Sequence, residues 1–182
     1  MDLRGHGGSD KPLEPEQYAA PELWTTDIDA VIHAMELENP ALVGWSMAGS
    51  IIADYVHRYG DEDIGALAFV GAFTSRETAE GQGVIHDEAL TQFRGMASHD
   101  PRTNITSTRT FVDMLTADDL DRERFATIFG SSMMVPPEVR GAILGRERQD
   151  SYAALADVQT PALVVHGTED QIVRLEASEY TA

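Results

Sequence analysis

The sequence predicts an α/β fold with a mostly parallel sheet. Three apolar runs, at 41–45, 64–72 and 161–166, have the length and composition of buried strands, and helical patterns lie between them. A serine among small residues joins the first run directly to a helical pattern. A second group of helical segments, at about 75–150, interrupts this order. We therefore expect an α/β domain that carries a helical insertion.

The segment before the first strand is expected to be a turn followed by a helix. Residues 1–12 are rich in glycine, which permits backbone angles that other residues avoid. They do not form a phosphate cradle, because Asp10 stands where a G-x-G-x-x-G motif needs its third glycine. Pro21 suits the first turn of a helix that we expect to reach about Glu38. The apolar residues at helical spacing are Leu23, Ile28, Val31, Ile32 and Met35.

The first strand leads into Ser46, which has the setting of a nucleophile elbow. A serine hydroxyl is a weak nucleophile, so it needs a tight turn on which a base can reach it. Gly44 and Ala48 stand two residues before and after Ser46, where larger side chains would crowd the turn. The N–H of Met47, at the start of the next helix, is a candidate oxyanion donor. The alternative is that Ser46 simply caps that helix.

The third strand is followed by a glycine turn and an acid. Catalytic groups of open α/β sheets lie at the carboxyl ends of the strands, where Asp170 is expected. A carboxylate there can orient a histidine and stabilise its charged form. Glu169 is the rival for this role, and a solvated pair of loop carboxylates is the alternative to both.

Composition excludes several classes of protein. The formal net charge of −18 argues against nucleic acid or an anionic membrane as partner. The chain has no cysteine, so disulfides, zinc fingers and a thiol nucleophile are excluded. Its histidines and carboxylates do not have the spacing of metal ligands, and no cofactor is expected. No signal peptide or membrane span is evident, which favours a cytoplasmic location.

Three motifs together resemble the α/β-hydrolase superfamily. They are D-x-R-G-x-G-x-S at 2–9, G-W-S-M-A at 44–48 and H-G-x-x-D-x-x-V at 166–173. The resemblance is greatest to esterases, epoxide hydrolases and cofactor-free haloperoxidases. It implies a three-layer αβα fold with a helical cap, divided into core residues 1–74, cap residues 75–150 and core residues 151–182. It also implies Ser46 as nucleophile, Asp170 as triad acid and the Met47 N–H as oxyanion donor.

The resemblance also indicates a pocket and a reaction. His6 and Trp45 would lie near the pocket, and Met133 and Met134 are the best candidates for its lining within the cap, because methionine adapts to irregular surroundings. A serine at position 46 implies acyl transfer from a small ester, lactone or related carbonyl substrate. Perhydrolysis, in which peroxide replaces water, is an open alternative.

Two expected parts of the family pattern are missing. The triad histidine should follow Asp170, but all six histidines precede it: His6, His33, His57, His86, His99 and His166. The turn that donates a second oxyanion N–H should lie upstream of Met1. We therefore expect an internal fragment of a longer hydrolase, incomplete at both ends, with an unpaired apolar edge on the strand ending at Trp45. The competing hypothesis is a non-catalytic remnant or interaction module.

Overall fold

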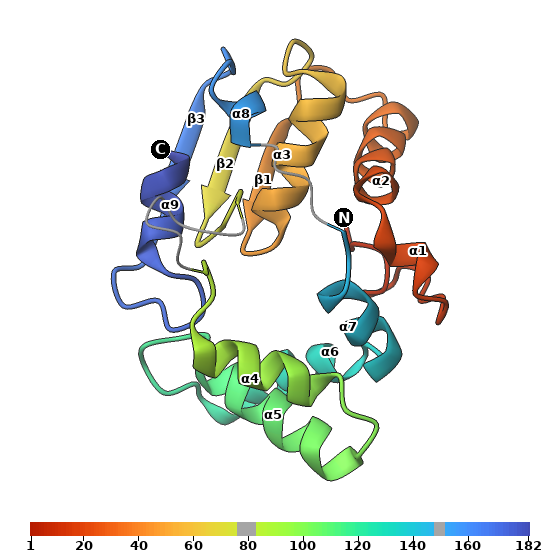
Figure 1. Ribbon diagram of the computed structural model, residues 1–182, viewed down its shortest axis with the longest axis vertical. Helices are drawn as coiled ribbons and strands as arrows, with labels where there is room; N and C mark the ends of the chain where they lie inside the picture. The colour runs from red at the N-terminus through yellow and green to blue at the C-terminus, as the bar shows by residue number, and fades with distance from the viewer. Residues whose placement is uncertain (76–82, 148–151) are drawn as a thin grey trace. The chain divides into compact units, whose positions relative to one another are not determined.

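Strands β1 (Ala41–Trp45), β2 (Ala66–Val70) and β3 (Ala162–Val165) form the sheet in the computed structural model, which describes residues 1–75, 83–147 and 152–182. Within that part of the chain the strands are parallel and lie in the order β1-β2-β3 (Figure 1). Gly44 is paired with Phe69, and Phe69 with Val164. The predicted strands and the parallel arrangement are thus confirmed, although β2 is shorter than the apolar run at 64–72. The edge strand β1 ends at Trp45, as expected.

The chain folds as two compact units, each with its own core. The helical unit consists of Met1–Ala20 and Ile85–Glu147, and the sheet unit of Pro21–Val84 and Arg148–Ala182. Residues 1–20, which we assigned to the core domain, thus belong with the helical segments. This grouping depends on residues far apart in the chain: Tyr18 is fully buried, and the Glu147 N–H donates to the Ala19 carbonyl. Both ends of the predicted insertion, at 76–82 and 148–150, lie outside the described residues.

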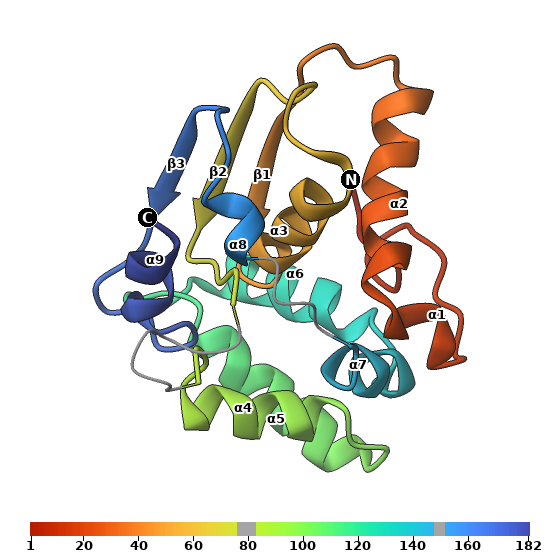
Figure 2. The same ribbon diagram turned by 45° about the horizontal axis from the view of Figure 1, so that its top comes forward.

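The sheet unit covers one face of its sheet with helix. Its helices are α2 (Pro21–Ala34), α3 (Ala48–Tyr59), α8 (Tyr152–Leu155) and α9 (Leu175–Thr181). Helix α3 packs on β1 and α2 packs on α3 (Figure 2). The buried side chains Trp24, Ile51 and Leu67 belong to this core. The sequence predicts helix to about Glu38, but α2 ends at Ala34, because Glu36 adopts a positive φ of 50° that no right-handed helix allows.

The helical unit contains α1 (Glu16–Ala19), α4 (Asp87–Met96), α5 (Pro101–Asp113), α6 (Arg122–Met133) and α7 (Pro137–Leu144). The Asp100 carboxylate caps α5 by accepting from the Thr103 N–H at 2.9 Å. The Asn104 side chain donates to the Met96 carbonyl at 2.6 Å and so joins α5 to the end of α4. These helices confirm the helical character predicted for 75–150, whereas a cap role stays a prediction. Across the described residues, no helix combines the length and apolar character that crossing a bilayer requires.

Candidate active site

Ser46 occupies a strained turn between β1 and α3. Its φ is +54°, in the left-handed region that residues other than glycine and asparagine rarely adopt. The turn is fixed on both sides, because the Ser46 N–H donates to the Val70 carbonyl at 3.1 Å and the Gly49 N–H donates to the Ser46 carbonyl at 3.1 Å. Such strain persists only where surrounding contacts enforce it, and it is typical of functional sites. The hydroxyl-bearing residue is half-buried at the carboxyl end of β1.

Gly44 lets β1 and α3 approach closely, and Gly49 lets the start of α3 approach the segment that follows β2. A Cβ at position 44 would lie 2.8 Å from Ile52 Cδ1 and 3.0 Å from the backbone carbonyl carbon of Ala48. A Cβ at position 49 would lie 2.9 Å from the Phe73 carbonyl oxygen. Gly44 therefore acts as the sequence predicts, because a larger side chain would force α3 away from β1.

Met47 follows Ser46 and directly precedes α3. Its φ of −55° and ψ of −29° are already helical, and it is the N-cap residue of that helix. The first N–H groups of a helix have no intrahelical acceptor and lie at its positive end. The role of the Met47 N–H as an oxyanion donor stays a prediction.

Asp170 lies beyond the carboxyl end of β3, at the same edge of the parallel sheet as Ser46. Its Oδ1 accepts hydrogen bonds from the N–H groups of Ile172 at 2.8 Å and Val173 at 2.9 Å, which hold the carboxylate in one orientation. Its Oδ2 lies 3.3 Å from where a Cβ would stand at Gly71, the residue that follows β2. Ser46 is hydrogen-bonded to the last residue of β2, so Ser46 and Asp170 flank the end of that strand.

Asp170 also has a neighbour that sequence reasoning missed. His166 Nε2 lies 3.3 Å from Asp170 Oδ2 and 3.0 Å from the Val173 carbonyl oxygen, while Nδ1 lies 2.5 Å from Ser178 Oγ. The imidazole is almost completely buried, with 3% of its surface exposed. Both ring nitrogens already have partners, so this histidine is suited to hold the acid loop rather than to accept a proton from Ser46. The four-residue spacing of His166 and Asp170 was the one available signal.

The predicted pocket residues are divided between the two units. Trp45, on β1, is 63% exposed. His6 lies in the glycine-rich turn of the helical unit, where its Nδ1 is 3.0 Å from the Arg4 carbonyl oxygen and burial lowers its pKa. Met133 and Met134, at the end of α6, are 37% and 54% exposed. Whether these four side chains line one pocket stays a prediction.

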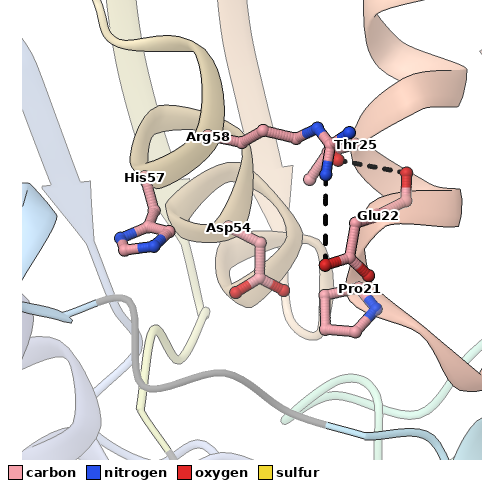
Figure 3. Close-up of a pocket in the computed structure, with 6 residues that line it drawn as sticks. All are labelled: Pro21, Glu22, Thr25, Asp54, His57 and Arg58. Atoms are coloured by element: carbon pink, nitrogen blue, oxygen red, sulfur yellow. Dashed lines mark hydrogen bonds and ion pairs between the residues drawn. The ribbon is translucent and has the colours of Figure 1, made fainter.

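Each unit has a hollow that is distinct from the predicted site. In the helical unit, a hollow of about 550 Å³ is lined from within 13–19, 97–99 and 137–145, which excludes both methionines. In the sheet unit, a polar hollow of about 220 Å³ lies between α2 and α3, beside the ion pair of Arg58 with Glu22 at 3.9 Å (Figure 3). Its lining includes the buried Asp54 and His57, which both lie in the second half of α3. At a rise of ~1.5 Å per residue, His57 lies roughly 16 Å from Ser46 along the axis of α3, so this hollow is remote from Ser46.

Comparison with known proteins adds a family and relatives. Residues 1–182 match the family model described as alpha/beta hydrolase fold. The chain is 28% identical to the AB hydrolase superfamily protein YisY of Bacillus subtilis, over 94% of this chain and 63% of that protein. It is also 28% identical to a pimeloyl-[acyl-carrier protein] methyl ester esterase of Aromatoleum aromaticum, over 99% of this chain and 71% of that protein. It is 33% identical to the solved esterase RhEst1 from Rhodococcus sp., with a TM-score of 0.88 over 99% of this chain and 65% of that one. The chain thus spans less than two thirds of two of these relatives.

Proposed function

The chain belongs to the α/β-hydrolase family, and we propose that it supplies the nucleophile and the acid of a serine-dependent hydrolase. The proposed substrates are small esters, lactones or related carbonyl compounds. The observation that carries the proposal is the left-handed φ of Ser46 in a strand-to-helix turn, enforced by the close approach of α3 to Gly44. The resemblance to esterases supports a hydrolytic reaction.

In the proposed mechanism, Ser46 Oγ attacks the substrate carbonyl carbon while an imidazole removes the hydroxyl proton. Asp170 holds that imidazole and stabilises its charged form, and the Met47 N–H donates to the developing oxyanion. The same imidazole protonates the leaving alcohol, and water then attacks the acyl-enzyme to release the acid. The imidazole and a second oxyanion N–H come from segments outside these 182 residues.

The positions of Ser46 and Asp170 support this division of labour. They stand at the ends of β1 and β3, with one strand between them, and neighbouring strands are ~4.8 Å apart. β1 and β3 are therefore ~10 Å apart, which leaves room for an imidazole ring between the hydroxyl and the carboxylate. The Asp170 Oδ1 is occupied by two backbone donors, and His166 Nε2 lies 3.3 Å from Oδ2, so the catalytic imidazole N–H would share Oδ2 with His166.

The test is an ester assay on two proteins: this chain, and the polypeptide extended by its own flanking coding sequence. We expect turnover of short-chain nitrophenyl esters by the extended protein and at least ~10³-fold less after Ser46→Ala, as for other serine hydrolases. Ser131→Ala, an exposed serine on α6, is the matched control and should leave turnover unchanged. Labelling of Ser46 by a fluorophosphonate probe gives an independent readout.

Other outcomes separate the alternatives. An extended protein without Ser46-dependent turnover or labelling supports the non-catalytic remnant. Ser46-dependent turnover by the 182-residue chain contradicts the need for an outside imidazole. Formation of peracid from the ester when peroxide is added favours the perhydrolase, which would use the same residues. The cytoplasmic location and the absence of nucleic-acid and membrane partners stay predictions.

A further inference from the structure

The buried histidine His166 takes no part in the proton transfers of the proposed mechanism. It directly follows β3, and its side chain is 3% exposed. Nδ1 lies 2.5 Å from Ser178 Oγ on α9, and Nε2 lies 3.0 Å from the Val173 carbonyl oxygen. Because both ring nitrogens have partners, the imidazole is held in one orientation and joins the end of β3 to α9.

The partners of the ring indicate which nitrogen carries a proton. A backbone carbonyl can only accept, so the His166 Nε2–H donates to Val173. In a neutral ring Nδ1 is then an acceptor, and the Ser178 hydroxyl donates to it at 2.5 Å. The same hydroxyl lies 3.4 Å from the Ala72 carbonyl oxygen, which is beyond the ~3.0 Å limit of an ordinary O–H···O hydrogen bond. These distances favour the Nε2–H tautomer.

Val173 connects this ring to Asp170. Its carbonyl oxygen accepts from His166, and its N–H donates to Asp170 Oδ1 at 2.9 Å. The Ile172 N–H donates to the same oxygen at 2.8 Å. Two donors thus fix Oδ1, but Oδ2 can still swing about the axis through Cβ and Oδ1. His166 Nε2, at 3.3 Å, is a polar contact on this second oxygen.

We propose that His166 is a positioning residue that holds Asp170 Oδ2 where the catalytic imidazole must meet it, and that Ser178 fixes the direction of the His166 hydrogen bonds. This inference rests on the proposed function, because Asp170 needs a fixed position only if it is the triad acid. The Nε2–H edge attracts Oδ2 without transferring a proton to it. A Cβ at Gly71 would lie 3.3 Å from Oδ2, so the absence of a side chain there keeps a second side of this oxygen accessible.

A positioning role and a purely structural role have different consequences. A residue that only stabilises the turn changes the fraction of folded protein, whereas a positioning residue changes the rate at which bound substrate reacts. A small displacement of a catalytic group lowers that rate by as much as ~10²-fold. Asp170 does not contact the substrate in the proposed mechanism, so the loss should fall on kcat and leave KM nearly unchanged.

Two amide substitutions distinguish the two ring nitrogens. The amide N–H of His166→Gln can reach the Val173 carbonyl, as the ring Nε2–H does, whereas the shorter side chain of His166→Asn ends near the position of Nδ1. In ester assays on the protein extended by its own flanking coding sequence, we expect kcat within about threefold of the parent for His166→Gln and about 10- to 100-fold lower for His166→Asn. Ser178→Ala should lower kcat less than His166→Asn, because Nε2 keeps its contacts.

Asp61→Asn is the matched control for loss of a clamp in the same unit. Asp61 Oδ2 accepts from the N–H groups of Gln159 at 2.9 Å and Thr160 at 2.8 Å, just before β3 begins. This clamp lies at the opposite end of β3 from Asp170. Asp61→Asn should therefore lower the urea midpoint of the extended protein but leave its kcat unchanged.

Nitrogen-15 NMR of the histidine rings gives a readout that does not depend on ester turnover. In the extended protein, the signal that disappears in His166→Gln belongs to His166. We expect this ring to carry a proton on Nε2 and none on Nδ1. The measurement uses the parent and His166→Gln, so it holds even if His166→Asn does not fold, and urea unfolding curves show which variants are folded in the assay.

Three results would overturn this proposal alone. The first is an active parent whose kcat is unchanged in folded His166→Asn. The second is an equal loss of kcat in His166→Asn and His166→Gln, because the Nε2–H donor would then be irrelevant. The third is a ring that carries a proton on Nδ1. A parent that hydrolyses no ester refutes the proposed function and this inference together, so the activity of the parent tells the two failures apart.

Discussion

Replacing Gly44 by alanine is expected to destabilise the sheet unit by about 1–2 kcal/mol. The added Cβ would meet Ile52 Cδ1 at 2.8 Å and the backbone C and O atoms of Ala48 at 3.0 Å. The end of the Ile52 side chain can rotate, but the Ala48 backbone moves only with the first turn of α3. Such overpacking costs ~1–3 kcal/mol, and the stiffer unfolded chain offsets ~0.4–1 kcal/mol of it.

The assay is urea unfolding followed by tryptophan fluorescence. Both tryptophans belong to the sheet unit, so the signal reports on that unit. Gly167→Ala is the matched control, because a Cβ there has nothing within 4 Å and its φ is not in the left-handed region. The control should be unchanged or slightly more stable. Adding Ile52→Val to Gly44→Ala removes Cδ1, and we expect a favourable coupling between the two substitutions.

A Gly44→Ala variant that unfolds at the same urea concentration as the parent chain would contradict a steric clash at position 44. Equal destabilisation of Gly167→Ala would contradict it as well, because the loss of stability would then be common to any glycine. If Gly44→Ala and Ile52→Val show no coupling, the clash of the new Cβ is with the Ala48 backbone and not with Ile52 Cδ1.

Three further predictions concern strain and charge. Ser46→Gly should be about 1 kcal/mol more stable than Ser46→Ala in urea, because glycine adopts φ +54° without strain, and both should abolish Ser46-dependent turnover. The Thr160 and Gln159 N–H groups lower the pKa of Asp61 from 3.8, so the stability it contributes is present above pH 3.8 and is lost as pH falls through the lowered pKa; Asp61→Asn should flatten this acid loss in pH-dependent unfolding curves. Burial lowers the pKa of His6, so its NMR titration midpoint should lie below 6.5; the helical unit should lose stability as pH falls below 6.5, and less so in His6→Gln.

The sequence predicts the elements of this fold well, because its signals are local. The run from Ala41 to Trp45 is β1 as predicted, and helical periodicity after Ser46 becomes α3. Gly44 also acts as predicted, since the small residues of the elbow have a steric purpose that can be read without coordinates. The end of α2 was wrong by four residues, because a positive φ at Glu36 leaves no periodic trace.

The site was predictable only in part. Ser46 and Asp170 could be assigned to the carboxyl ends of strands, because strand ends in a parallel sheet share one edge. The burial of His166 against Asp170 could not, since it depends on a turn that folds back and on Ser178, twelve residues away on α9. Nor does the sequence reveal that residues 1–20 join the helical unit, because the contact of the Ala19 carbonyl with the Glu147 N–H joins residues distant in the chain.

By itself, the sequence determined the strands, the helices, the elbow and the acid that follows β3, all of which rest on patterns a few residues long. Only the tertiary structure decided which face of the sheet α3 covers. The three strands are apolar on both sides, so their alternation does not distinguish Leu67, which is buried, from Val43 and Leu163, which are exposed. The face that α3 covers depends on the path of the chain between the strands, which short sequence patterns do not determine.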